Sequence, residues 1–223
     1  MIEPTPTYTI PPATRTPYPT STKSEHEYID PLIEVLEVSD PASASYDPGS
    51  AAYAQFPEVL KELAALNSTT NNAASMLGYA MGFPRPDSIL AARSLISLGS
   101  DTAGTELPAL IGYLTNPRSD IRMYSAIVLS ITGKNGSCSL GNIGPLLWDP
   151  DPYVRTSAAL AIQGITGKAL VAEGYAITPE ALDLNFPMAA DSPEGKIVDN
   201  ARIWWTETGS KVNWHPSYDL CDP

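Results

Sequence analysis

Histidine and cysteine, two residue types that often carry out acid–base and nucleophilic chemistry, are scarce in this chain of 223 residues, whereas pairs of Asp or Glu stay open as acid–base groups. Its two histidines, His26 and His215, lie close to opposite ends of the sequence. A Ser-His-Asp or Cys-His site would have to use one of them. The sequence contains no GxSxG, HExxH, GxxxxGK[ST] or GxGxxG segment. We therefore expect a protein that is not an enzyme, with no catalytic residues, no cofactor and no metal site.

One acidic loop, WDPDPY at Trp148–Tyr153, offers oxygen ligands of the kind that calcium prefers. The loop lacks the glycine and the distal glutamate of an EF-hand. Asp149 and Asp151 also stand directly before a helical pattern, where a carboxylate caps the helix and suits its dipole. We therefore interpret the two aspartates as helix caps.

The charge of the chain excludes some partners. Its formal net charge is -12 at pH 7, and a surface that binds phosphate needs clustered Lys and Arg. We therefore expect no nucleic acid and no anionic membrane surface as partner. The sequence has no run of 18 apolar residues, so we also expect no transmembrane segment. Proteins remain the main candidates, while neutral glycans and cations stay open.

The two cysteines, Cys138 and Cys221, are far apart in the sequence. No CxxC spacing and no nearby histidine pair accompanies them, which argues against zinc. In an oxidising compartment they are candidates for a disulfide that would hold the C-terminal tail in place. The entropic gain from closing a loop of that length would be roughly 4 kcal/mol.

Residues 1–24 have an unusual composition, since more than half of them are Pro or Thr. Such a segment buries little surface and favours extended conformations, so we expect a disordered tether. The segment resembles the Thr/Pro spacers of bacterial surface proteins. That resemblance implies an extracytoplasmic protein, either secreted or surface-anchored, including as a lipoprotein whose signal is missing from this chain.

From Glu25 the sequence predicts helices, at Tyr28–Val38 and Phe56–Asn67 first. The segment 116–133 then recurs as 149–167, with a shift that places Pro117 over Pro150, and Pro84 begins a copy one such shift earlier. Paired apolar helices with such a period are typical of a helical solenoid, because one copy cannot bury its own apolar face. Three glycines should end helices in a left-handed conformation: Gly99, Gly133 and Gly167.

The helix-opening segments NPRSDIR and DPDPYVR, the small-residue helices AARSLISLG, YSAIVLSITG and TSAALAIQGITG, and the preceding LPALIGYL and IGPLLW resemble the HEAT-repeat family in its short bacterial form. The resemblance is strong over about residues 84–167. It implies an all-α fold, namely a right-handed α-solenoid of HEAT-like helix pairs. It also implies a ladder in which Arg122 and Arg155 join aspartates of neighbouring turns, for which Asp120 and Asp151 are available.

The resulting organisation has three parts. The tether at 1–24 is followed by HEAT-like helical repeats at 25–167 and by a C-terminal cap of helix and loop at 168–223. The cap contains a last helix at Lys196–Ser210.

We expect this protein to be a non-enzymatic, extracytoplasmic protein-binding or scaffold module. The binding face would be made by the second helix of each pair and the loop before it, and its candidate residues are Arg85, Arg118, Arg122, Tyr124, Tyr153 and Arg155. Two aromatic residues near the C-terminus, Trp205 and Trp214, either join an interface or only cap the core.

Three alternatives stay open. In the first, the chain is a self-assembling structural subunit of a cell-surface structure, and its partner is another copy of itself. In the second, which rests on analogy with some HEAT-like bacterial proteins, the chain is a lyase or isomerase acting on a tetrapyrrole chromophore. In the third, the C-terminal aromatic residues form a glycan-binding surface.

Overall fold

The computed structural model describes residues 26–66, 71–170, 193–212 and 214. All regular structure in this part of the chain is helical, and no strand occurs in it, so the fold class is all-α. The predicted tether at 1–24, the side chain of His26, His215 and Cys221 lie outside the described residues.

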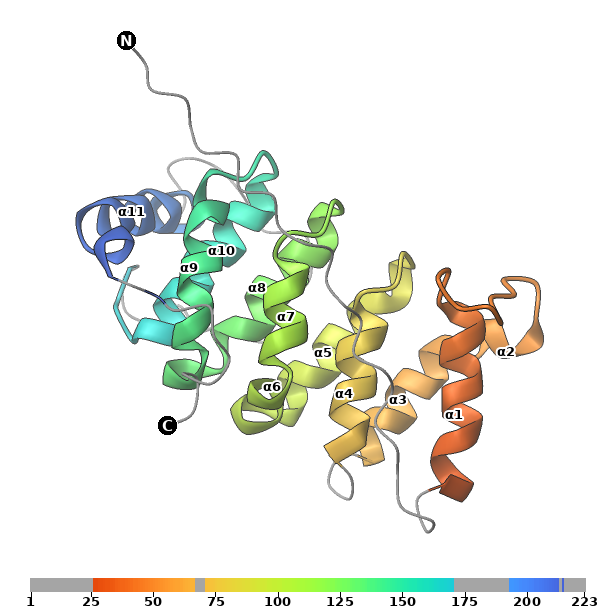
Figure 1. The fold of residues 1–223 in the computed structure, drawn as a ribbon. Coiled ribbons are helices and arrows are strands. Elements are labelled where there is room, and N and C mark those ends of the chain that lie inside the picture. Colours follow the sequence, from red (N-terminus) through yellow and green to blue (C-terminus); the bar gives the residue numbers. More distant parts are fainter. Residues whose placement is uncertain (1–25, 67–70, 171–192, 213, 215–223) are drawn as a thin grey trace.

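The helices follow one another along a row roughly in chain order, from α1 and α2 at one end to α11 at the other (Figure 1). Contacts join helices that are near in sequence, such as α3 with α4, α5 with α8, and α8 with α10. The longer elements are α1 (His26–Ser39), α3 (Phe56–Leu66), α4 (Asn71–Met81), α5 (Ile89–Leu98), α8 (Ser119–Ser130), α10 (Pro152–Thr166) and α11 (Pro193–Glu207). The shorter ones are α2 (Ala51–Ala54), η1 (Pro86–Ser88), α6 (Ser100–Thr105), α7 (Leu107–Tyr113), η2 (Gly133–Ser139), α9 (Leu140–Ile143), η3 (Gly144–Trp148) and η5 (Gly209–Lys211).

Small residues let α8 and α10 lie unusually close together. A Cβ added at Gly164 of α10 would lie 2.0 Å from the backbone oxygen of Ser130 on α8. Ala126, Ala158 and Ala161 are fully buried in the same region. Because each helix buries its apolar residues against the next, the core runs along the row as one continuous cluster.

The three glycines expected at helix ends all have a positive φ, of 92° at Gly99, 56° at Gly133 and 66° at Gly167. Gly167 has the left-handed geometry of a C-cap, and its amide donates to the carbonyl of Gln163. Gly99 lies between α5 and α6 and has a ψ of 178°, so it does not have the left-handed cap geometry that we expected.

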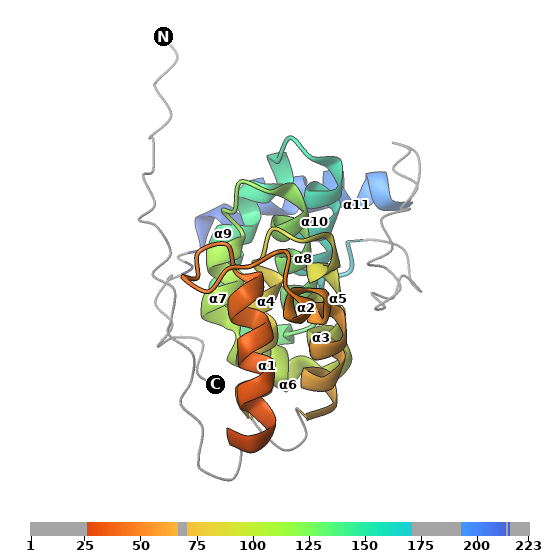
Figure 2. The same cartoon turned by 90° about the vertical axis from the view of Figure 1, so that its right-hand side faces the viewer.

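The turns that lead into α5, α8 and α10 lie along one edge of the row, as does the loop between α1 and α2 (Figure 1). Seen along the row, these turns gather at one end of the helices (Figure 2). We call residues 83–88, 115–119 and 148–152 the turn ridge. It contains the loops that the sequence analysis assigned to binding.

Candidate binding surface

Each turn of the ridge places a proline on the surface. Pro84, Pro117 and Pro150 are exposed, and they occupy equivalent positions of the repeat. Each of these prolines lies two residues before the first residue of the helical element that follows it, η1, α8 or α10, and so outside that element. Pro86 and Pro152 are the prolines at a first helical position, where a restricted φ suits the helix and a missing N–H costs nothing. The ridge therefore presents the same apolar ring three times at regular intervals.

Arg122 joins two turns of the ridge. Its Nη1 donates to the carbonyl oxygens of Asn116 at 2.7 Å and Pro117 at 3.1 Å, within its own turn. Its Nε and Nη2 donate to the two carboxylate oxygens of Asp149 in the next turn, both at 2.8 Å. The two side chains are 12% and 6% exposed, so this bidentate ion pair is largely shielded from water.

The two aspartates named for the ladder in the sequence analysis have other roles. Asp120 pairs with Arg118 of its own turn. Asp151 caps α10 by accepting a hydrogen bond from the amide of Tyr153 at 2.9 Å. The cap confirms the interpretation of Asp151, whereas the ladder runs through Asp149.

Arg155 makes the same two carbonyl contacts as Arg122 but, among the described residues, not the carboxylate contact. Its Nη1 donates to the carbonyl oxygens of Asp149 at 2.8 Å and Pro150 at 3.0 Å. Within the described part of the chain no carboxylate pairs with its Nε and Nη2 edge. Arg155 is therefore the last arginine of the described ladder, and it keeps hydrogen-bonding capacity.

Arg85 lies in the interior rather than on the ridge surface, at 8% exposed. Its guanidinium pairs with both oxygens of Asp87 at 2.9 Å and lies 3.7 Å from the ring centre of Tyr53 and 4.3 Å from that of Phe56. It also donates to the Ser39 hydroxyl and the Tyr53 carbonyl. Through these contacts the Arg85 side chain holds the first helices together.

Arg118 has the equivalent position one shift later and is more accessible. It pairs with Asp120, and its Nη1 donates to the carbonyl oxygen of Phe83 at 3.2 Å. About a third of its side chain remains exposed, at 33%.

Tyr124 is buried at 5% exposure, inside α8. Burial raises the pKa of its phenol, and the negative charge of Asp120 adds to the shift. Its ring packs in the core, so a partner on the ridge would not contact it directly. Tyr153 is half-buried and packs against the edge of the core, where its outer side remains accessible.

The C-terminal tryptophans fill gaps left by glycines. A Cβ at Gly144 would lie 2.0 Å from a ring carbon of Trp205, so this ring packs directly on the η3 backbone. The indole N–H of Trp214 donates to the Gly209 carbonyl at 2.7 Å. Both side chains are half-buried, which is the geometry of a cap with an accessible edge.

Trp148, which the sequence analysis did not name as a binding residue, is 53% exposed at the last turn of the ridge. The guanidinium of Arg202 from α11 lies 5.8 Å from its ring centre and donates to the Leu147 carbonyl at 2.9 Å. The repeat aligns Trp148 with the exposed Thr115, and this alignment predicts its exposure. An exposed tryptophan beside an arginine is typical of an interface anchor.

Glu106 is a buried acid whose pKa is raised above its ordinary value. It is buried between α6 and α7 and accepts hydrogen bonds from Ser75 at 2.8 Å and Thr105 at 3.3 Å. Desolvation raises the pKa of this carboxyl, and the two hydrogen bonds partly oppose the rise. The arrangement lets Glu106 hold a proton, but it lies inside the packing of α4, α6 and α7.

Cys138 is disulfide-bonded. Because Cys221 lies outside the described residues, the bridge between the two stays a prediction. In the same described ranges, no cluster of three or more His, Cys, Asp or Glu side chains is arranged to hold a metal ion. No described helix combines the length and the hydropathy that crossing a membrane requires.

The geometry thus divides the predicted residues into two groups. Arg85 and Tyr124 are buried, and Arg122 is largely shielded by its ion pair with Asp149. Accessible edges on or next to the ridge belong to Arg118, Tyr153 and Arg155, together with Trp148, and Trp205 and Trp214 have accessible edges near the C-terminus. Searches of family models, curated proteins and solved structures with this chain found no match.

Proposed function

We propose that this chain is a non-enzymatic, protein-binding or scaffold module of the bacterial cell surface, built as a right-handed α-solenoid of HEAT-like helix pairs. The turn ridge is its binding surface. The observation that carries the proposal is the combination of ordered turns with exposed apolar groups, namely the prolines of the three turns and Trp148.

The hydrogen bonds inside the ridge support this role. Arg122 ties its own turn to the next through Asp149, and Arg118 ties its turn to the Phe83 carbonyl of the preceding one. A surface that is already ordered loses less conformational entropy on binding, and therefore gains affinity from the same contacts.

The disulfide at Cys138 supports the extracytoplasmic location. Disulfides persist in secreted and surface proteins and are rare in the reducing cytosol. The Thr/Pro-rich composition of residues 1–24 favours the same location. No contact in the described residues favours the chromophore-lyase or glycan-binding alternative.

The test uses the full chain as bait in an envelope extract from the source organism, followed by quantitative mass spectrometry. Trp148→Ala and Tyr153→Ala should reduce capture of a specific protein at least about tenfold, since hot-spot aromatics contribute about 2 kcal/mol or more. The matched control is Ile203→Ala, because Ile203 on α11 is similarly exposed, at 56%. Capture that survives both ridge variants would contradict the proposal.

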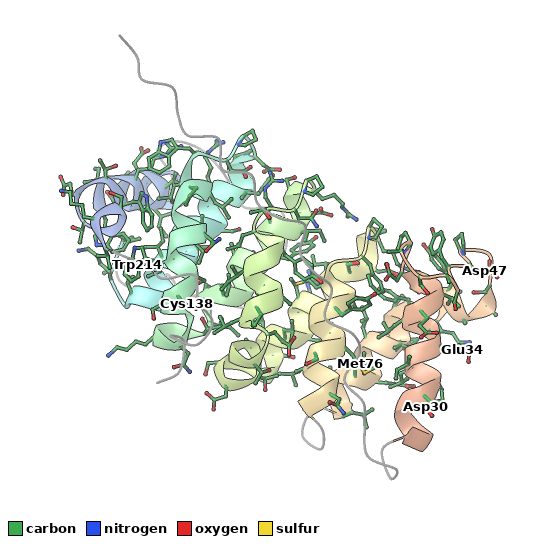
Figure 3. All side chains as sticks on the ribbon, in the orientation of Figure 1. Asp30, Glu34, Asp47, Met76, Cys138 and Trp214 are labelled. Atoms are coloured by element: carbon green, nitrogen blue, oxygen red, sulfur yellow. The ribbon has the colours of Figure 1, made fainter. Side chains whose placement is uncertain are left out.

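Self-assembly is a second candidate, because the two ends of the molecule carry complementary groups. Arg155 belongs to α10, towards one end of the row (Figure 1), and the exposed Asp47 lies at the other end (Figure 3).

A further inference from the structure

Two equivalent arginines are used unequally in this fold. Arg122 uses Nη1 for its own turn and the Nε–Nη2 edge for the aspartate of the next turn. Arg155 uses Nη1 in the same way, on the two equivalent carbonyls. Its outer edge has no carboxylate partner among the described residues. The contact of Arg122 with Asp149 therefore indicates a ligand for the Nε–Nη2 edge of Arg155, namely the carboxylate of an aspartate in a turn.

The surroundings of Arg155 favour an acidic and partly apolar partner. Arg155 donates to the carbonyl of Asp149, and Arg202 donates to that of Leu147, so both guanidinium groups lie against one short segment. Trp148 projects from the middle of that segment. Asp149 is already paired with Arg122, and the exposed Asp199 lies 3.5 Å from Arg202. Arg155 is thus the arginine at this end whose outer edge has no described carboxylate partner, and it lies near an exposed aromatic ring, while Arg202 is paired with Asp199 and Asp151 belongs to the same turn.

The opposite end of the row presents the matching group. Asp47-Pro48 forms the same Asx turn as Asp149-Pro150: an Oδ1 accepts from the amide two residues later, at 3.0 Å for Asp47 and 2.9 Å for Asp149. The backbone around Asp47 is fixed, because its amide donates to the Val38 carbonyl at 3.1 Å. Asp47 is exposed, as is the neighbouring Tyr46 at 41%.

We propose that copies of this chain associate head to tail, with the Nε–Nη2 edge of Arg155 in one copy binding the Asp47 carboxylate of the next. Trp148 of the first copy packs against Tyr46 and Pro48 of the second. The contact continues the ladder from one molecule to another. This proposal rests on the proposed function, in the form in which the chain is a scaffold module. Because the two surfaces differ, the contact does not close on itself and produces open chains rather than a two-fold dimer.

Charge repulsion does not forbid this contact. Each copy carries a net charge of -12, but at 0.15 M salt charges are screened beyond about 8 Å. A bidentate Arg–Asp pair forms at short range and is screened less, particularly beside aromatic rings that exclude water.

The test is sedimentation velocity on the full chain over increasing concentrations in about 0.15 M NaCl. We expect reversible association that Asp47→Asn weakens at least about tenfold, because truncating one partner of a desolvated charge pair has effects of that order. Asn can form the same Asx turn as Asp. Asn116, which aligns with Asp149 in the repeat, accepts a hydrogen bond from the Arg118 amide at 3.0 Å. Asp101→Asn removes the same charge at an exposed site elsewhere and should leave association unchanged.

A reciprocal exchange makes the assignment specific. Arg155→Asp and Asp47→Arg should each abolish self-association, because each places like charges opposite one another. Mixing the two variants should restore association, since the mixture again contains a complementary pair of surfaces. Thermal melting of each variant beforehand verifies that it is folded.

A wild-type chain that stays monomeric at all concentrations would overturn the inference, as would association that neither exchange alters. If the chain is monomeric and Trp148→Ala still abolishes capture of a different protein, the inference fails while the proposed function stands. If both measurements are negative, both fail.

Discussion

Replacing Arg122 with Ala should destabilise the fold far more than the same change at Arg155. At Arg122 the substitution leaves Asp149 as a carboxylate only 6% exposed without its cation, and frees two carbonyls. Removing one partner of a buried ion pair costs about 3–5 kcal/mol. At Arg155 only the two carbonyl contacts are lost, at a cost of about 1–2 kcal/mol.

Urea unfolding at pH 7, followed by circular dichroism, measures both free-energy changes. A total stability of about 5–15 kcal/mol is typical of a domain, so the Arg122 variant should show a midpoint well below that of the wild type. A double-mutant cycle with Asp149→Asn isolates the pair, since Asn keeps the turn and removes only the charge. We expect a coupling energy of about 1–3 kcal/mol. A coupling below about 0.5 kcal/mol, or equal losses at Arg122 and Arg155, would refute the reasoning.

Three further predictions concern the interior. The pKa of Glu106 is raised in the folded state, so its contribution to stability is fully present below the unfolded-state pKa and is lost as pH rises through the folded-state pKa. The melting temperature of Glu106→Gln relative to the wild type should therefore increase between pH 4.5 and 7.5, and a difference independent of pH would contradict this. A non-reduced digest should contain one peptide pair linking Cys138 to Cys221, and reduction should lower stability by about 4 kcal/mol; a thiol-labelled Cys221 in the native protein would exclude the bridge. Arg85→Ala should cost about 2–4 kcal/mol, because it leaves Asp87 without its cation and uncovers the Phe56 ring; a loss below about 1 kcal/mol would show that the first helices do not depend on it.

The sequence predicted the helices with a regular apolar spacing. The predicted helix at 56–67 corresponds to α3 (Phe56–Leu66), and that at 196–210 to α11 (Pro193–Glu207). The pattern missed α4 (Asn71–Met81), whose NNAASMLGYAM has small residues in place of a clear apolar stripe. Its stability comes from packing against α3 and α5, which a local pattern does not show.

The site was predictable only in part. Repeat alignment correctly indicated that the first turns of α8 and α10 carry equivalent arginines, because Arg122 and Arg155 recur at the same shift as Pro117 and Pro150. It did not indicate that Arg122 would select Asp149 over Asp151, since both precede the same helix and only the three-dimensional spacing of the turns decides between them. Nor did residue type separate the buried Tyr124 from the accessible Tyr153.

Hydrogen–deuterium exchange of the full chain, with and without the protein that it captures, tests the ridge most directly. We expect slower exchange on binding in three segments at equivalent positions of the repeat, at 83–88, 116–121 and 149–154, where amides of the ridge turns would become covered. Protection confined to α11, or absent from all three turns, would contradict the assignment of the turn ridge as the binding surface.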